Sequence, residues 1–155
     1  NESLNLDEKM VYPNDQTPDN AIEISDNFLT VGALNYDYGS KLVADFSNYG
    51  KKNVDVFAPG NKIWSTTPNN EYEYLQGTSM ASPEVAGIAA MIRSYFPKLT
   101  APQVKKIIMD SGLPVQANVI VGGDRLNTQE FSELSTSGKI VNLYNALILA
   151  SKVSK

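Results

Sequence analysis

Short apolar runs between polar turns mark the first part of the chain as a set of strands. Residues 28–34 and 54–58 are rich in β-branched and aromatic side chains, and the second run stops at a Pro-Gly pair, which is typical of buried strands. Residues 1–20 are polar and rich in Asp and Asn. They predict a loop, with order beginning near Ile22.

A β-hairpin is predicted further on, because residues 63–67 and 71–75 flank the turn sequence Pro68-Asn69-Asn70. The second arm alternates glutamate with tyrosine. Such tyrosines either line a substrate cleft or occupy half-buried sheet positions, and the second arrangement is the commoner one. We therefore expect Tyr72 and Tyr74 to be half-buried.

Residues 79–95 are apolar on nearly every face of a helical wheel and predict an α-helix that ends before Pro97. A helix that is apolar all round and too short to span a bilayer belongs in a protein core. Gly87 and the neighbouring alanines permit the close approach of another backbone. We expect this helix to need cover on every side.

A second helix begins at Thr100, which with Gln103 has the pattern of a capping box. Gly112 is expected to end this helix. Its apolar face is formed by Val104, Ile107 and Ile108, and its solvent-facing side by Lys105 and Lys106.

Residues 114–137 are mostly polar and predict a loop, with a turn at Gly122-Gly123 and a short hairpin around residues 119–121. A last helix is predicted over roughly residues 143–152. Its inward face is formed by Leu143, Ala146, Leu147 and Ala150.

The composition indicates a globular protein and argues against several other classes. The 155 residues form one domain or part of a larger one, and 42% hydrophobic content is enough for a core. The formal net charge is −4 and no basic stripe is present, which argues against a nucleic-acid partner. Cysteine is absent, so disulfides and thiolate metal sites are excluded. No apolar run reaches the roughly 18 residues needed to span a membrane.

Ser79 is the candidate nucleophile, since it begins the apolar helix within Gly77-Thr78-Ser79-Met80-Ala81-Ser82-Pro83. Gly77 permits a tight backbone path, and the first N–H groups of a helix lack intrahelical partners. Together with the helix dipole, these donors would stabilise an oxyanion. Pro83 is expected in the first turn, where its missing N–H costs nothing. The plainer alternative is that Ser79 or Ser82 merely caps a core helix.

Other serine chemistries fit the pattern less well. The α/β-hydrolase elbow needs glycine two residues after the serine, where Ala81 stands. A Ser-x-x-Lys pair is absent, because Ser82 occupies the lysine position. A Ser-Lys hydrolase that uses Lys98 has no spacing to support it.

The motif from Gly77 to Pro83, followed by Val85-Ala86-Gly87, resembles the nucleophile motif of the subtilisin-like serine peptidases, the subtilases. Segments on both sides resemble the same family. The resemblance covers most of residues 28–112 and 138–150, whereas residues 113–137 match loosely. The matching segments are residues 31–33, 46–50, 54–60 and 63–66 before the serine, and residues 100–111 and 138–142 after it.

The resemblance implies a Ser-His-Asp endopeptidase in which Ser79 is acylated. In the family the Asp and His precede the segments matched here, and this chain contains no histidine. It also opens on Asn1 rather than Met. Residues 1–155 therefore resemble the C-terminal portion of a subtilase catalytic domain, and we expect this chain alone to be inactive. Its parts are a loop-rich start (1–27), strands and turns (28–76), the nucleophile helix with the next helix (77–112), and a loop or hairpin with the last helix (113–155).

Asn1 is the second site residue implied by the resemblance. An oxyanion-hole asparagine closes an Ala-Gly-Asn motif in the family, and Asn1 is followed, as in relatives, by Glu2-Ser3 and a loop. The alternative is that Asn1 is a frayed terminus.

Three other acidic residues are interpreted as structural. Glu84 occupies a position where many relatives carry a non-catalytic histidine, and a carboxylate in the first helical turn is favoured by the dipole. Asp45 and Asp55 lie in segments that match family positions other than the triad acid, so we expect turn or strand-edge roles. Some relatives bind calcium. Residues 5–20 have the residue types for a structural calcium site but no ligand spacing.

The intact domain is expected to be α/β, a three-layer α/β/α fold with a mainly parallel sheet, helices on both faces, and the active site at the C-terminal strand ends. No cofactor is expected to be required. The expected partners are a protein or peptide substrate and the N-terminal half of the same domain, and the isolated chain is expected to oligomerise or rearrange. The resemblance favours an exported protein: periplasmic, cell-surface or secreted. The competing hypothesis, motivated by the missing histidine, is a non-catalytic pseudopeptidase or binding module.

Overall fold

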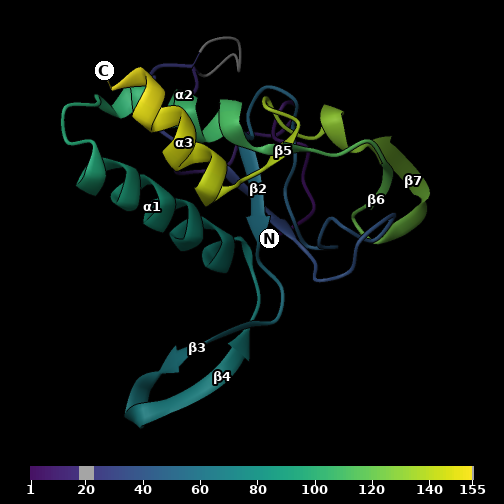
Figure 1. The fold of residues 1–155 in the computed structure, drawn as a ribbon. Helices are drawn as coiled ribbons and strands as arrows, with labels where there is room; N and C mark the ends of the chain where they lie inside the picture. The colour runs from purple at the N-terminus through teal and green to yellow at the C-terminus, as the bar shows by residue number, and fades with distance from the viewer. Residues whose placement is uncertain (18–22, 155) are drawn as a thin grey trace.

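A computed structural model describes residues 1–17 and 23–154 (Figure 1). The expected onset of order at Ile22, and the end of the predicted N-terminal loop, lie outside the described residues. Residues 1–17 contain no helix and only isolated β-bridges, so this part of the loop prediction is confirmed. None of the described helices has both the length and the apolar character needed to cross a bilayer.

Four short strands form the central sheet in the order β1-β2-β8-β5. The strands β1 (Val31–Leu34), β2 (Val56–Pro59) and β8 (Lys139–Ile140) run parallel, and β5 (Leu113–Pro114) pairs antiparallel with β8. This mainly parallel sheet agrees with the expected α/β class.

Three helices pack on one face of the sheet (Figure 1): α1 (Thr78–Tyr95), α2 (Ala101–Ser111) and α3 (Leu143–Val153). The predicted capping box at Thr100 is present, and Gly112 ends α2. A Cβ at Gly112 would lie 2.7 Å from the carbonyl oxygen of Ile140. Glycine is therefore required there by the close approach of β8. Helix and sheet share one core, which includes Ala33, Val56, Ala58, Val85, Ile92, Ile107, Ile108 and Ala146.

The opposite face of the sheet is covered by a β-hairpin, β6 (Asn118–Val121) and β7 (Asp124–Glu130), followed by the 3-10 helix η2 (Phe131–Glu133). Gly122 and Gly123 have φ values of 65° and 71° and form the predicted two-residue turn. In the described residues all α-helices cover the other face, so they do not form the second helical layer that was expected of the intact domain.

The prediction of a loop over residues 114–137 was wrong for the hairpin's second strand. The strand β7 is polar, and it forms because its backbone pairs with the apolar strand β6. The hairpin closes a second core in which Phe131 contacts Phe57, with ring centroids 5.2 Å apart. A Cβ at Gly32 would lie 2.3 Å from the Phe57 ring, so glycine makes room for this aromatic pair.

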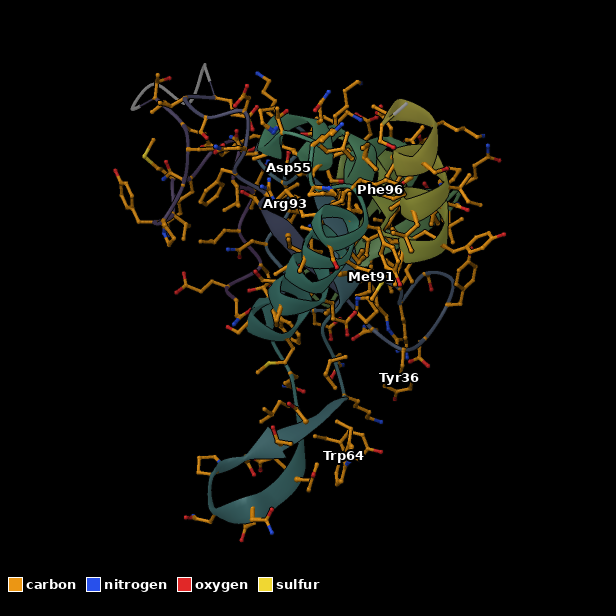
Figure 2. All side chains as sticks on the ribbon, turned by 60° about the vertical axis from the view of Figure 1, so that its left-hand side comes forward. Tyr36, Asp55, Trp64, Met91, Arg93 and Phe96 are labelled. Carbon is orange, nitrogen blue, oxygen red and sulfur yellow. The ribbon has the colours of Figure 1, made fainter. Side chains whose placement is uncertain are left out.

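The helix α1 is not enclosed on every side. Ala81, Val85 and Ile92 are buried against the sheet and the other helices. Its opposite face, which we call the open α1 face, is exposed, and Figure 2 shows Met91 on the outside of the helix. The open α1 face consists of Ala86, Gly87, Ala90 and Met91.

The start of α1 also differs from expectation. Because the helix begins at Thr78, Pro83 and Glu84 lie in its second turn, and the first turn contains no acidic residue. At this position the missing N–H of Pro83 leaves the carbonyl of Ser79 without its usual intrahelical donor.

Lys105 is buried, whereas the sequence pattern placed it in solvent. Its ammonium lies 3.1 Å from Asp55 Oδ1 and also contacts Glu23. Asp55, just before β2, accepts a 2.7 Å hydrogen bond from the N–H of Thr30. Burial raises the pKa of the Asp55 carboxyl, and the bonds from Thr30 and Lys105 only partly oppose that rise. Burial works against the charge on Lys105, but its bonds to Glu23 and Asp55 outweigh it and raise the lysine pKa.

The predicted hairpin is confirmed as β3 (Ile63–Thr67) and β4 (Glu71–Leu75), joined by the 3-10 turn η1 (Pro68–Asn70). It projects away from the rest of the molecule (Figure 1). Tyr72 and Tyr74 are 57% and 67% exposed, so the prediction that they are half-buried was wrong. The hairpin stands clear of the sheet and helices, and its aromatic side chains pack on one another.

Candidate active site

Gly77 places the start of α1 at the C-terminal ends of two parallel strands. Its N–H donates to the carbonyl of Gly60 at 2.8 Å, and the N–H of Gly60 donates to Leu34 at 3.1 Å. Gly60 follows β2 and Leu34 ends β1. The φ of 146° at Gly77 is one that residues with a side chain rarely adopt. Sites in parallel sheets lie at this edge, so the candidate nucleophile is where such a fold places its chemistry.

Ser79 is the second residue of α1 and is exposed. The backbone N–H groups on either side of it have acceptors: Thr78 donates to Asn1 Oδ1 at 2.8 Å, and Met80 donates to the carbonyl of Gly77 at 3.0 Å. The N–H of Ser79 has no acceptor among the described residues. It is one of the free donors that a helix presents at its N-terminus.

The Asn1 side chain is fixed beside this donor. Its Oδ1 accepts from both the N–H and the hydroxyl of Thr78, each at 2.8 Å. Its Nδ2 has no acceptor within the part of the chain that the structure describes. A Cβ added to Gly77 would lie 3.3 Å from Asn1 Nδ2 and 3.6 Å from the Ser79 nitrogen. The amide and the free N–H therefore flank a single space, which is open because residue 77 has no side chain.

Two hollows meet at Asn1. One, of about 210 Å³, is lined by Asn1 and Thr78 together with apolar side chains that include Leu6, Val11 and Val54. The other, of about 520 Å³, is lined mainly by polar side chains, among them Glu2, Asp45 and Gln76. A larger cavity of about 610 Å³ is lined by residues 114–118 and 137–138 among others, and by neither Asn1 nor Ser79.

The remaining sequence candidates form no contact with Ser79 or the Asn1 side chain among the described residues, although Asp45 lines the polar hollow. Asp45 is in an exposed turn, and Asp55 is committed to Lys105. Lys98 follows the C-terminal end of the 18-residue α1, about 27 Å along the helix from its start, which excludes it as the base for Ser79. Glu84 is partly buried, and burial raises the pKa of its carboxyl.

A carboxylate of the polar N-terminal loop, Asp7, binds backbone groups of the turn before β2. Asp7 accepts from the N–H groups of Lys52 and Asn53 at 3.0–3.1 Å. Among the described residues no three acidic, histidine or cysteine side chains are grouped to hold a metal ion.

Comparison with known proteins decides the family. A family model for the subtilase family matches residues 1–138 of the chain. The chain belongs to the subtilase family. The match includes residues 113–137, where the sequence resemblance was loose, and subtilases are a family of serine proteases.

Individual subtilases agree with this assignment. Subtilisin DY from Bacillus licheniformis is 38% identical over 104 residues, which cover 67% of this chain and 36% of that protein. The solved structure of the patellamide maturation protease PatA is 30% identical, with a TM-score of 0.59 over 80% of this chain and 43% of PatA. A protease from Pseudoalteromonas arctica gives a TM-score of 0.60 at 28% identity, covering 80% of this chain and 36% of that one. The chain thus has the subtilase α/β fold and spans less than half the length of these relatives.

Three features of the site were not predicted from the sequence. Thr78 holds the Asn1 amide, Gly60 anchors the turn before Ser79, and Gly77 keeps the space between the two donors open. The sequence did point to Gly77 as a tight backbone position and to Gly60 as the end of a strand, but their partners are 17 residues or more away in the chain. No local spacing signals such contacts.

Proposed function

We propose that this chain carries the nucleophile and the oxyanion hole of a serine endopeptidase. The observation that carries the proposal is the space above Gly77, flanked by Asn1 Nδ2 and the N–H of Ser79. In this proposal the histidine and aspartate come from polypeptide outside these 155 residues, because the chain contains no histidine.

The proposed reaction begins when Ser79 Oγ attacks the carbonyl carbon of a peptide bond and gives its proton to the histidine. The carbonyl oxygen becomes an oxyanion that accepts hydrogen bonds from Asn1 Nδ2 and the Ser79 N–H, with support from the positive end of α1. The histidine then protonates the leaving amine, and water hydrolyses the acyl-enzyme by the reverse sequence. No cofactor takes part.

The substrate in this proposal is a protein or peptide, and the site of action is outside the cytoplasm. The second point rests on family membership, because subtilases are commonly secreted or extracellular. The open α1 face supports the proposed partner, the N-terminal half of the same domain. Ala86, Gly87 and Ala90 are small residues that would let a second backbone approach closely.

Covalent labelling tests the role of Ser79. A complete catalytic domain that includes these residues is expected to react with a fluorophosphonate at Ser79, as located by peptide mass spectrometry. The 155-residue chain alone is expected neither to label nor to hydrolyse a peptide p-nitroanilide, because an unactivated serine is a weak nucleophile. Ser79→Ala in the complete domain is expected to lose the label, and Ser82→Ala to keep it. A complete domain that stays unlabelled would refute the proposal.

The chain without its partner is expected to self-associate through the open α1 face, because exposed apolar surface favours association. Light scattering is expected to give a mass above 16.9 kDa for the isolated chain. Met91→Glu on that face is expected to lower the mass, and Lys152→Glu at the end of α3 to leave it unchanged. A monodisperse monomer at micromolar concentration would contradict this expectation.

A pseudopeptidase or binding module is the second candidate, and the absence of histidine from the sequence favours it. The labelling experiment separates the two proposals, since a pseudopeptidase would leave Ser79 unmodified even in the complete domain.

A further inference from the structure

The β3–β4 hairpin carries three aromatic side chains on one surface. Trp64 pairs directly with Tyr74, and Tyr72 pairs with Thr66 two positions along, so the three rings lie on the same side of the ribbon. The Trp64 ring centroid is 4.7 Å from that of Tyr74 and 6.2 Å from that of Tyr72. All three side chains are more than half exposed. We call this surface the aromatic face.

Next to the aromatic face, where the hairpin joins the body of the molecule, a lysine of the chain itself already packs on a tyrosine ring. The ammonium of Lys62, one residue before β3, lies 4.1 Å from the ring centroid of Tyr36 and donates a 3.0 Å hydrogen bond to its hydroxyl. Figure 2 shows Tyr36 at the edge of the body next to the hairpin that carries Trp64. The local chemistry is thus suited to a lysine ammonium against an aromatic ring.

Charge around the aromatic face favours a cationic partner. Glu71 and Glu73 alternate with Tyr72 along β4, so their side chains leave the opposite side of this two-stranded hairpin, and Asp37 adjoins Tyr36. Lys62 is the one basic residue between positions 62 and 76, and it is occupied by Tyr36. These acidic groups give the hairpin as a whole a negative field that attracts cations, and the electron-rich faces of the rings attract them at the aromatic face itself.

The spacing of the rings fits an extended peptide. Alternate side chains of an extended strand point the same way and are about 6.6 Å apart, close to the 6.2 Å between the Trp64 and Tyr72 rings. Two basic residues at positions i and i+2 of such a peptide would each meet one ring.

We propose that the aromatic face is a binding surface for an extended peptide segment with lysine or arginine at alternate positions, their cations stacked on Trp64 and Tyr72. This binding is independent of hydrolysis at Ser79.

Trp64 is the only tryptophan in the chain, so its fluorescence reports on the aromatic face directly. Titrating the 155-residue chain with a Lys-Ser-Lys-Ser-Lys peptide is expected to change the Trp64 emission saturably. The apparent affinity is expected to fall as salt is raised from about 0.02 to 0.3 M, because the peptide lysines and the acidic side chains of the hairpin are all exposed to solvent and are screened by salt. An isosteric norleucine peptide is expected to bind much more weakly.

Matched variants locate the binding. Tyr72→Ala is expected to weaken binding roughly two- to fivefold, the value of one exposed cation–π contact, and Glu71→Gln with Glu73→Gln to reduce the salt dependence. Tyr144→Ala, which removes a tyrosine of α3 that is also more than half exposed, is expected to change neither the affinity nor its salt dependence. Circular dichroism checks that each variant is folded.

Three results would overturn the proposal. Equal binding of the norleucine and lysine peptides would make the face a purely apolar docking site. A saturable response to a chito-oligosaccharide, with none to the lysine peptide, would make it a carbohydrate surface. No saturable response to the lysine peptide at low salt, with the chain folded, would leave no binding surface of the proposed kind.

Discussion

Replacing Lys105 with methionine is expected to lower the free energy of unfolding by about 3–5 kcal/mol, the cost of leaving a buried charge without its partner. Lys105 is a buried residue of α2, and its ammonium contacts Asp55, itself 7% exposed, and Glu23. Methionine keeps most of the side-chain volume and removes the charge. Urea denaturation of the chain, followed by circular dichroism, measures the change.

Two further variants give this prediction its controls. Lys106 pairs with Asp110 at 2.9 Å on the exposed side of the same helix, and Lys106→Met is expected to cost no more than about 0.5 kcal/mol. Adding Asp55→Asn to Lys105→Met is expected to recover much of the loss, because an amide can still accept the Thr30 N–H without carrying charge. A Lys105→Met variant as stable as the parent would contradict the burial described for the pair.

The loss in free energy of unfolding caused by Lys105→Met is also expected to depend on pH. Burial already raises the pKa of Asp55, and loss of the ammonium raises it further. A carboxyl whose pKa is raised on folding gains stability from protonation, and that gain disappears as pH rises through the folded-state pKa. The difference between variant and parent is therefore expected to be largest near pH 7 and to shrink as pH falls toward about 4, the ordinary range for an aspartate.

If Asn1 belongs to the proposed oxyanion hole, replacing it with leucine in a complete catalytic domain is expected to lower kcat about 100- to 1,000-fold while changing KM little, the magnitude known from the oxyanion-hole asparagine of subtilisin. Leucine has a similar shape but no donor. The oxyanion exists only along the reaction path, so the loss falls on kcat and not on substrate binding. Steady-state kinetics with a peptide p-nitroanilide measures both constants.

Thr78→Val provides a graded comparison. It removes the hydroxyl that holds Asn1 Oδ1 but keeps the backbone N–H that does the same. A smaller loss in kcat is expected, because the amide keeps one of its two hydrogen bonds. If Asn1→Leu changed KM and left kcat intact, Asn1 would be a substrate-binding residue and not part of an oxyanion hole.

The parts of the fold that followed from the sequence are those set by local chemistry. The capping box at Thr100, the turn at Gly122-Gly123 and the β3–β4 hairpin each depend on residues a few positions apart. Parts that depend on distant partners did not follow. Lys105 looked like a surface lysine because its partner Glu23 is 82 positions away, and β7 has too polar a sequence to signal a strand without β6.

The candidate site divides in the same way. The position of Ser79 at a helix N-terminus could be predicted from Gly77 and the apolar run after it. The role proposed for Asn1 came only from family resemblance, since the hydrogen bonds that bring it to Thr78 span 77 positions. A pattern that records only residue type cannot place two such segments together.

The hydrogen bond between Gly77 and Gly60 gives the aromatic hairpin an unusual freedom. The chain leaves β2 at Gly60 and returns to the same place at Gly77. Residues 61–76 therefore form an insertion whose two ends are joined by a hydrogen bond. Their length and side chains can diverge during evolution, or be exchanged by grafting, without moving Ser79. The molecule thus separates the fixed position of Ser79 from an adjacent hairpin that can be changed on its own.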